Sequence, residues 1–286
     1  MDVSIVSRME CDMPLKLMYI TNNPEIAKIA EKNGVDRIWV DLESRGKEQR
    51  QRNRDTVKSH HTIADVKAVS EVLDTSELMV RINPWDKDST KEIEAVIDAG
   101  AKRIMLPMWE NVDEVNSFLS LVNERAQTTL LLETKEAVEC LDEVLELPLI
   151  DEIHIGLNDL HLSYGLTFMF ELLSNGIVEE ICKKCAAKQI PYGFGGVARI
   201  GEGMLPAEQI IMEHYRLGST RAILSRSFCD ANKESMETVQ SVFSVNMQRL
   251  RAYEALLSKK NSDDYEKNKE TVKECINRIV CSIKEK

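Results

Sequence analysis

The sequence of 286 residues lacks the features of membrane-bound and secreted proteins. No apolar run approaches the ~20 residues that a helix needs to cross a bilayer. The first residues, "MDVSIVSRMECDMP", contain no basic segment followed by an apolar one. The seven cysteines are odd in number and scattered, which is typical of reduced thiols rather than of a disulfide framework. We therefore expect a cytoplasmic protein without a membrane partner.

The sequence also lacks an excess of positive charge. It has 37 Lys and Arg residues against 48 Asp and Glu, a net charge of −11 and a pI near 5.1. This balance argues against a general role in binding nucleic acid. A hydrophobic content of 43% and a charged content of 30% are ordinary for a globular protein. The length suits either one large α/β barrel or two small domains.

Eight short apolar segments alternate with stretches of helical periodicity. They span residues 15–20, 37–43, 77–83, 103–108, 128–134, 152–157, 190–196 and 221–226. Short apolar strands separated by single helices are typical of a parallel sheet covered on both faces. Eight such units predict an α/β fold, a TIM (β/α)8 barrel formed by residues 1–230, and a doubly wound open sheet is the alternative. Ser89 and Glu92 predict a capping box at the start of one of the helices.

Two segments fall outside this repeat. Residues 231–286 predict a C-terminal extension of two helices, and the last carries an apolar stripe of Val272, Cys275, Ile276, Ile279, Val280 and Ile283. Such a stripe covers either its own barrel or a neighbouring subunit, and we expect a homo-oligomer. Residues 45–58 hold six Lys and Arg residues and two acids. This segment is either a solvated or intersubunit surface, or it binds an acidic substrate through Arg45 and Lys47.

Polar side chains stand at the carboxyl ends of four predicted strands, where TIM barrels have their active sites. They are Asp41 and Glu43, Arg81, Glu133 and Asp159. Neighbouring strands are ~4.8 Å apart, so Glu133 and Asp159 can share one ion. Two carboxylates completed by waters suit Mg²⁺ or Mn²⁺. The alternative is that Glu133 is an acid at the start of a helix and Asp159 caps a turn.

Other residues near these strand ends are candidates for binding the substrate and for proton transfer. The stretch "GFGGVARIGEG" contributes Gly195, Gly196 and Arg199, whose backbone and guanidinium can approach an anionic ligand. The alternative is a tight turn that needs glycine. His60, His61 and His161 are candidate proton carriers near neutral pH, or else histidines that only make hydrogen bonds.

The stretch "LLETKEAVECLDEVLELPLIDEIHIGLNDLHLSYG" closely resembles a hallmark of the metal-dependent 2-oxo-acid aldolase and citrate lyase family of HpcH/HpaI type. The segments "GVDRIWVDLE", "VRINPWD" and "DAGAKRIMLPM" are similar to strands 2 to 4 of that family. The similarity extends from about residue 15 to residue 229.

This resemblance implies a TIM-barrel lyase that breaks or forms carbon–carbon bonds of a 2-oxo acid, such as pyruvate or oxaloacetate, through a metal-bound enolate. It implies that Glu133 and Asp159 bind Mg²⁺ or Mn²⁺ and that Arg81 faces the enolate oxygen. A metal and a fixed guanidinium stabilise charge where an enolate develops it.

The sequence departs from the family at the positions that transfer protons. The aldolase branch has a histidine where this chain has Ser44, and a glutamine where this chain has Leu131. The thioester lyases have DLED, whereas this chain has DLES. We expect Glu43 and His61 to take part in catalysis instead. The substrate is a small anionic acid that is either free, phosphorylated or linked to coenzyme A. A lyase of citrate or malyl thioesters and a non-catalytic metal-binding barrel are the alternatives.

Overall fold

The computed structural model describes residues 13–45 and 61–285. Eight strands form a closed parallel barrel in chain order, which confirms the predicted TIM-barrel fold. The strands are β1 (Lys16–Ile20), β2 (Arg37–Asp41), β3 (Glu77–Arg81), β4 (Arg103–Leu106), β5 (Gln127–Leu132), β6 (Ile153–Ile155), β7 (Tyr192–Val197) and β8 (Arg221–Leu224). Each strand overlaps one of the eight segments that the sequence predicts.

Helices follow the strands, but two follow β5 and three follow β6, where the sequence predicts a single helix between strands. They are α1 (Pro24–Lys32), α3 (Ile63–Ser70), α4 (Ser89–Asp98), α5 (Val112–Val122), α6 (Lys135–Glu139), α7 (Leu141–Val144), α8 (Leu157–Ser163), α9 (Glu171–Ser174), α10 (Ile177–Ala187), α11 (Ala207–Arg216), α12 (Met236–Leu257) and α13 (Ser262–Lys284). None of these helices has the length and the apolar character that crossing a membrane requires. The chain divides into two compact units, residues 18–153 and residues 1–17 with 154–286.

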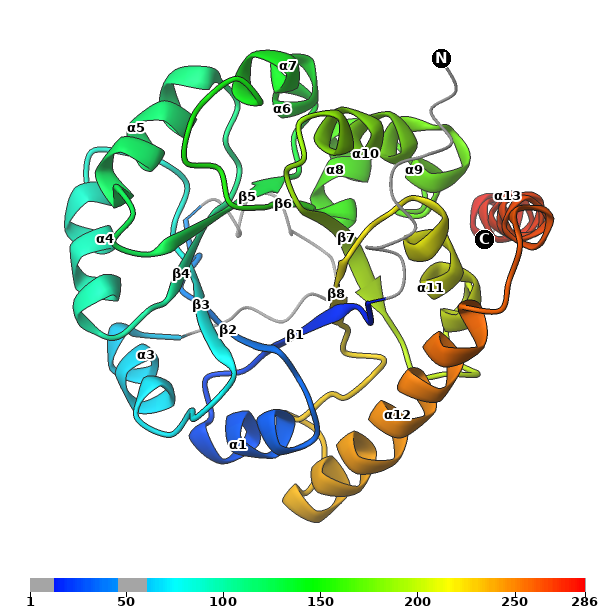
Figure 1. Ribbon diagram of the computed structural model, residues 1–286, viewed down its shortest axis with the longest axis horizontal. Coiled ribbons are helices and arrows are strands. Elements are labelled where there is room, and N and C mark those ends of the chain that lie inside the picture. Colours follow the sequence, from blue (N-terminus) through cyan, green and yellow to red (C-terminus); the bar gives the residue numbers. More distant parts are fainter. Residues whose placement is uncertain (1–12, 46–60, 286) are drawn as a thin grey trace. The chain divides into compact units, whose positions relative to one another are not determined.

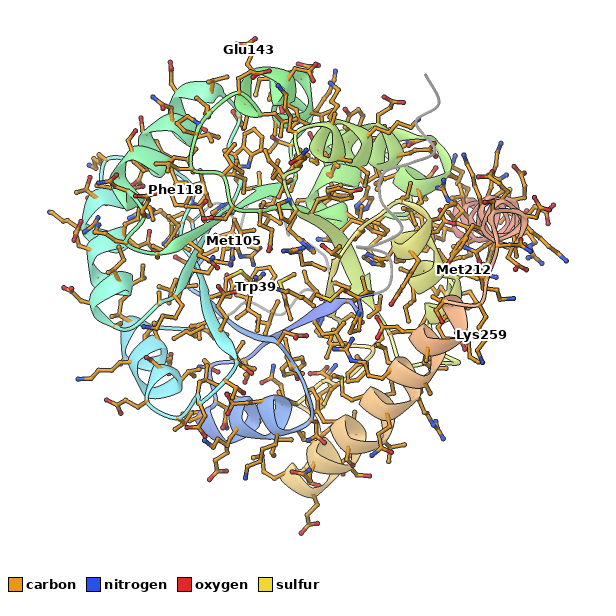
Figure 2. The ribbon with its side chains drawn as sticks, in the orientation of Figure 1. Trp39, Met105, Phe118, Glu143, Met212 and Lys259 are labelled. Carbon is orange, nitrogen blue, oxygen red and sulfur yellow. The ribbon has the colours of Figure 1, made fainter. Side chains whose placement is uncertain are left out.

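In the unit of residues 18–153, helices α3, α4 and α5 lie outside strands β2 to β5 (Figure 1). Trp39 and Met105 lie on the inner side of these strands, Phe118 lies between strands and helices, and Glu143 points outward (Figure 2). Strands β2 and β3 pair in register, with Trp39 opposite Met79 and Asp41 opposite Arg81. Because side chains alternate along a strand, every second residue faces the same side.

A buried layer of charge lies at the amino ends of these strands. Arg37 donates to Glu152 at 2.8 and 3.2 Å and to Glu77 at 2.5 Å. Arg103 donates to Glu77 at 3.0 Å and has a guanidinium nitrogen 3.9 Å from Glu152. We call these two arginines and two glutamates the amino-end cluster. Its formal charge is zero, and each of the buried ions Arg37, Arg103 and Glu152 has an opposite charge beside it, as buried ion pairs require.

The capping box predicted from Ser89 and Glu92 is wrong. Asp88 is the N-cap of α4 and makes no capping hydrogen bond with its side chain. Glu92 instead accepts from the side chain of Asn83 at 2.7 Å and from its backbone N–H at 3.2 Å. Ser89 accepts from the backbone N–H of Asp86. A nearby polar loop therefore competes successfully for the side chains that would otherwise cap the helix.

In the second unit, α12 follows β8 in the way that each barrel helix follows its strand. The side chain of Glu254 on α12 accepts from the backbone N–H of Leu15 at 2.8 Å. Helix α13 lies beside α9 and α11 (Figure 1). Asn268 on α13 donates to Glu213 of α11 at 2.8 Å, and Val272 and Ile276 are buried. The inner part of the predicted stripe thus packs on the chain's own helices, while Ile283 is 37% exposed.

Candidate functional site

Arg81 and two carboxylates meet at the carboxyl ends of β2 and β3. Arg81 binds Asp41 with two parallel hydrogen bonds of 2.8 Å, from Nε and from Nη2. The same Nη2 lies 3.3 Å from Oε2 of Glu43. Asp41 and Glu43 are each only 2% exposed. Planar, two-point pairing fixes the guanidinium firmly, as arginine–carboxylate forks do.

The charges around Arg81 stabilise its positive form. Burial by itself lowers the pKa of Arg81, but the charges of Asp41, Glu43 and Glu133 outweigh that effect and raise it above the ordinary value. The guanidinium carbon also lies 5.0 Å from the centre of the Trp39 ring, a cation–π contact. Its Nη1 donates to no group in the described part of the chain. This nitrogen is therefore the donor that Arg81 can offer to a ligand.

Glu133 follows β5 directly and is 3% exposed. Its Oε1 accepts from the backbone N–H of Met108 at 3.2 Å. The next residue, Thr134, caps α6 by accepting from the N–H of Ala137 and donates to the carbonyl of Trp109 at 2.9 Å. Glu133 thus precedes the cap of α6 rather than acting as one.

We call Asp41, Glu43, Glu133 and Arg81 the carboxyl-end cluster. Three carboxylates and one guanidinium give these four groups a formal charge of −2. The barrel order makes β5 the neighbour of β6, and the N–H of Leu130 donates to the carbonyl of Glu152 at 3.0 Å. The four residues of the cluster stand at the carboxyl ends of their strands, which is where TIM barrels have their active sites.

His61 and Asn83 hold the chain beside this cluster. The backbone N–H of Asp41 donates to Nδ1 of His61 at 3.0 Å, which favours the ring tautomer that carries its proton on Nε2. Asn83 accepts through Oδ1 from the backbone N–H groups of Ser44 and Arg45, both at 3.0 Å. Sequence analysis missed Asn83. Its position two residues after Arg81, at the end of the same strand, was the available signal.

Arg45 lies in this loop, and its guanidinium forms ion pairs with Asp86 and with Asp88, the latter at 3.3 Å. All three side chains are exposed by a third or more, so these pairs are weak. Arg45 is therefore shared between two acids of the loop after β3. Lys47 and His60 lie outside the described residues.

The remaining predicted site residues belong to the second unit. Asp159 is half-buried on α8, directly after β6. Gly195 has a positive φ of 50°, and a side chain there would lie 2.6 Å from Leu157 of α8. The absent side chain at Gly195 thus makes room for α8, two residues before Asp159. Gly196 lies on the same strand, β7, and Arg199 donates to the carbonyl of Phe228 at 2.7 Å.

His161, another of the predicted proton carriers, is 6% exposed, and its Nδ1 lies 3.1 Å from the carbonyl of Leu157. This contact connects residues four apart on the same helix. The arrangement is that of a buried histidine that makes a local hydrogen bond.

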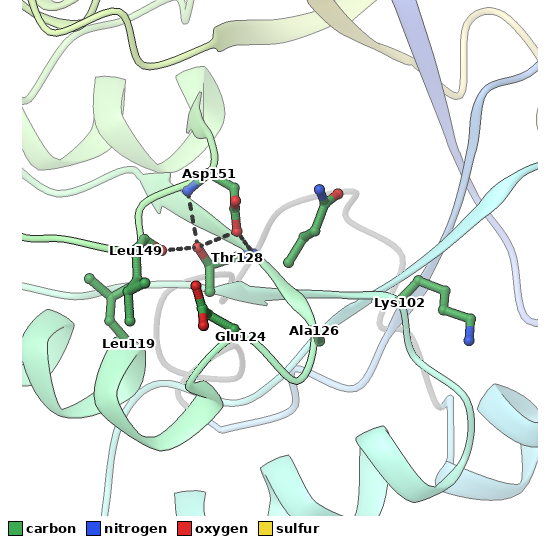
Figure 3. A pocket seen from close by; sticks show the side chains of 8 residues that line it. Lys102, Leu119, Glu124, Ala126, Thr128, Leu149 and Asp151 are labelled. Carbon is green, nitrogen blue, oxygen red and sulfur yellow. Dashed lines mark hydrogen bonds between the residues drawn. The ribbon is translucent and has the colours of Figure 1, made fainter.

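A separate pocket of about 340 Å³ lies near the amino end of β5 (Figure 3). It is lined by Lys102, Leu119, Glu124, Ala126, Gln127, Thr128, Leu149 and Asp151. Asp151 accepts from the N–H of Thr128 at 2.7 Å, which joins the chain before β6 to β5. Because catalytic residues of TIM barrels lie at the carboxyl ends of the strands, this pocket belongs to the face that contributes to stability.

The donor groups suit a hard divalent cation. Carboxylate oxygens are the ligands that Mg²⁺ and Mn²⁺ prefer, and Glu133 and Asp159 are the two residues that the sequence predicts for this role. Within residues 13–45 and 61–285, no three His, Cys, Asp or Glu side chains are arranged to hold an ion by themselves. A site with two carboxylates leaves the other coordination positions to water and substrate, which is the arrangement typical of Mg²⁺.

Comparison with known protein families identifies the family of the chain. The model of the HpcH/HpaI aldolase/citrate lyase family matches residues 16–191. The chain belongs to this family, and it is therefore a lyase. Members of the family generally depend on a divalent metal and act on small acids. No curated protein matches the sequence.

Solved structures of low sequence identity share the fold. An HpcH/HpaI aldolase from Desulfitobacterium hafniense DCB-2 is 14% identical, with a TM-score of 0.60, over 86% of this chain and 96% of its own. A member of the HpcH/HpaI aldolase/citrate lyase family from Burkholderia cenocepacia J2315 is 15% identical, with a TM-score of 0.60, over 81% and 95%. The citrate synthase SbnG is 15% identical, with a TM-score of 0.58, over 86% and 96%.

Proposed function

We propose that this protein is a carbon–carbon lyase that requires Mg²⁺ or Mn²⁺ and acts on a small 2-oxo acid through an enolate. The observation that carries the proposal is the carboxyl-end cluster, in which three buried carboxylates gather around one guanidinium. Carboxylates that lie close together are the groups that bind a divalent cation, because the cation reduces their mutual repulsion. Membership of a family of aldolases and citrate lyases supports the same reaction class.

Glu133 and Asp159 are the residues that would hold the cation. Their support is the order of the strands, because each follows one of two neighbouring strands at its carboxyl end. A divalent cation bound there supplies Lewis-acid stabilisation of negative charge on the oxygens of a 2-oxo acid. The N–H of Met108 donates to Oε1 of Glu133, which fixes one oxygen of that carboxylate.

Arg81 would stabilise the enolate from the protein side. When the carbon–carbon bond breaks, its electron pair moves onto the oxygen of the 2-oxo group. Arg81 is fixed by Asp41 and Trp39, and its Nη1 can donate to that oxygen without reorganisation. Gly195, Gly196 and Arg199 remain proposed substrate contacts from the second unit, and Arg45 and Lys47 remain proposed contacts to a distant anionic group.

Glu43 and His61 would manage the proton that the enolate carbon takes up or loses. Glu43 is buried beside Arg81, and its carboxylate can accept a proton. His61 accepts at Nδ1 from the backbone of Asp41, so any proton exchange with the substrate uses Nε2. We expect a shift in the pH–rate profile of Glu43→Gln, and a smaller one in that of His61→Gln.

Decarboxylation of oxaloacetate tests the proposal. The bond between C3 and the adjacent carboxylate breaks, carbon dioxide leaves, and the enolate gains a proton at C3 to give pyruvate. With Mn²⁺ added, we expect turnover by the wild type and loss of at least ~10³-fold in Glu133→Gln and Asp159→Asn, because metal and substrate sites disappear together. Equal turnover in wild type and both variants would contradict the proposal.

We also propose that the protein is a homo-oligomer with α13 at the contact. Val272 and Ile276 pack within the chain, so the exposed end of the stripe is the relevant surface. The double variant Ile279→Glu with Ile283→Glu should lower the mass measured by light scattering. An unchanged mass would count against this contact.

A further inference from the structure

Met108 has a left-handed backbone in a place where a helix end does not explain it. Its φ is 52°, a conformation that costs an L residue with a side chain of this size roughly 1–2 kcal/mol. Asn123 and Gln189 share this conformation, but they follow the C-terminal ends of α5 and α10, where left-handed residues are common. Met108 instead follows β4 by two residues.

The conformation of Met108 points its N–H at the proposed metal ligand. That N–H donates to Oε1 of Glu133 at 3.2 Å. The following residue, Trp109, accepts from Thr134 at 2.9 Å, so the turn is attached to the chain on both sides of this contact. Glu133 is 3% exposed, and its carboxylate therefore takes its orientation from protein groups. Strained backbone that is held by surrounding contacts often accompanies functional sites.

We propose that the left-handed turn at Met108 is a positioning device that presents Glu133 to the divalent cation. This inference rests on the proposed function, in which Glu133 is a metal ligand. Met108 acts through its backbone and through Glu133, so its side chain contributes little to the affinity. A residue at position 108 that readily adopts the left-handed conformation would then increase the fraction of molecules in which Glu133 is oriented for binding.

A series of substitutions separates this role from simple packing. Glycine and asparagine accept a left-handed backbone, whereas valine and isoleucine resist it. Mn²⁺ affinity of the full chain is measured by calorimetry for Met108→Gly, Met108→Asn, Met108→Val and Met108→Ile. We expect Gly and Asn to stay within about twofold of wild type, and Val and Ile to bind about three- to tenfold more weakly. The proposal would be overturned if the affinity fell most in the variants with the smallest side chains, Gly and Asn. It would also be overturned if all four variants bound Mn²⁺ equally.

Leu149 provides the matched control, since it has a φ of 70° and lies at the pocket near the amino end of β5. Leu149→Val and Leu149→Gly should change the melting temperature and leave Mn²⁺ affinity unaltered. Weaker binding by Leu149→Val, equal to that of Met108→Val, would overturn the positioning role, because general destabilisation would then explain both.

Glu133→Gln separates a failure of the proposed metal site from a failure of the positioning role of Met108. If it binds Mn²⁺ as tightly as wild type, the proposed function fails. If Glu133→Gln no longer binds Mn²⁺ but all Met108 variants bind it with the affinity of wild type, only the positioning role fails.

Discussion

The two ends of strands β2 to β5 both carry buried charge, and the two clusters differ in balance. At the amino end, Arg37 and Arg103 face Glu77 and Glu152, and the charges cancel. At the carboxyl end, Arg81 faces Asp41, Glu43 and Glu133, and a charge of −2 remains among these four groups. The same strands thus support one layer with equal numbers of acidic and basic groups and one layer with an excess of acidic groups, where we propose that a divalent cation binds.

A middle layer separates the two clusters. It consists of residues such as Trp39, Met79, Met105 and Leu131, all of them 2% exposed or less. Each lies two residues before or after a member of a cluster, so the alternation of a strand puts all three layers on the same side. Buried ion pairs add little net stability, but breaking one partner is costly. We therefore expect substitutions at the amino end to change stability and those at the carboxyl end to change metal binding and catalysis.

The largest expected effect on stability comes from Glu152→Gln in the amino-end cluster. The substitution removes one of the two carboxylates that pair with Arg37. Burial disfavours the positive form of this guanidinium, so the lost partner is costly. We expect a loss of about 3–5 kcal/mol in the free energy of unfolding, measured by urea titration, with Mn²⁺ affinity unchanged. A Glu152→Gln variant that keeps its stability but no longer binds Mn²⁺ would contradict the assignment of stability to the amino-end cluster and of metal binding to the carboxyl-end cluster.

Arg81→Lys tests the carboxyl end. Lysine keeps the charge but cannot make two parallel hydrogen bonds to Asp41 or hold a donor in a fixed plane. We expect kcat for oxaloacetate decarboxylation to fall by about 10²–10³, the scale for losing one donor to a developing oxyanion. Mn²⁺ affinity should stay within a few-fold of wild type, because the charge of the cluster is preserved. A rate close to that of wild type would exclude Arg81 from the reaction.

His214 lies in neither cluster, and we expect it to lower the free energy of unfolding at acidic pH. Its effect must be separated from the effects of the two clusters. Burial, with a smaller effect of His154, lowers the pKa of His214 to about 3 from an ordinary value of 6.5. Between these pH values the unfolded chain binds a proton that the folded chain does not. Stability should therefore fall as pH drops from 6.5 toward 3, by at most about 1.4 kcal/mol per pH unit.

His214→Phe is the variant that isolates this effect. The ring of His214 stacks on Phe194 with centroids 3.8 Å apart, so an aromatic replacement keeps the stacking. Urea titrations at pH 7 and pH 4.5 should show a smaller difference in the variant than in wild type. An equal difference in both proteins would assign the acid sensitivity to other groups.

The smallest expected effect concerns Arg45. Because its exposed guanidinium is shared with Asp86 and Asp88, Arg45→Gln should change stability by less than about 1 kcal/mol. If Arg45 also attracts an anionic substrate, KM should rise a few-fold at low ionic strength and the difference should shrink as salt is added. A KM that is identical at low salt would leave Arg45 as a surface residue.

Much of this fold was predictable from the sequence, because apolar strands alternating with helices have few other solutions. Arg81, Asp41, Glu43 and Glu133 were also predictable as a group, since each comes at the end of an apolar strand. The contacts that orient them were not. Hydrogen bonds such as Asn83 to the loop after β2, or Met108 to Glu133, join residues through turns that no periodicity describes.

One predicted feature loses to a tertiary contact, and a second has a role that the sequence alone could not decide. Glu92 has the spacing of a capping residue, yet Asn83 lies close enough to take both of its oxygens. Gly195 has the character of a ligand-binding glycine, and in the structure its missing side chain makes room for Leu157. Glycine is required in either case, so sequence alone could not separate the two roles.

We propose above that a divalent cation binds at the carboxyl-end cluster through Glu133. Mn²⁺ calorimetry on three proteins tests this proposal most directly. Wild type and Glu152→Gln should bind one Mn²⁺ per chain with similar affinity, since the amino-end cluster is already balanced. Glu133→Gln should bind at least ~100-fold more weakly, because it loses a charged ligand. If Glu133→Gln binds Mn²⁺ as tightly as wild type, the cluster is not the metal site and the account is wrong.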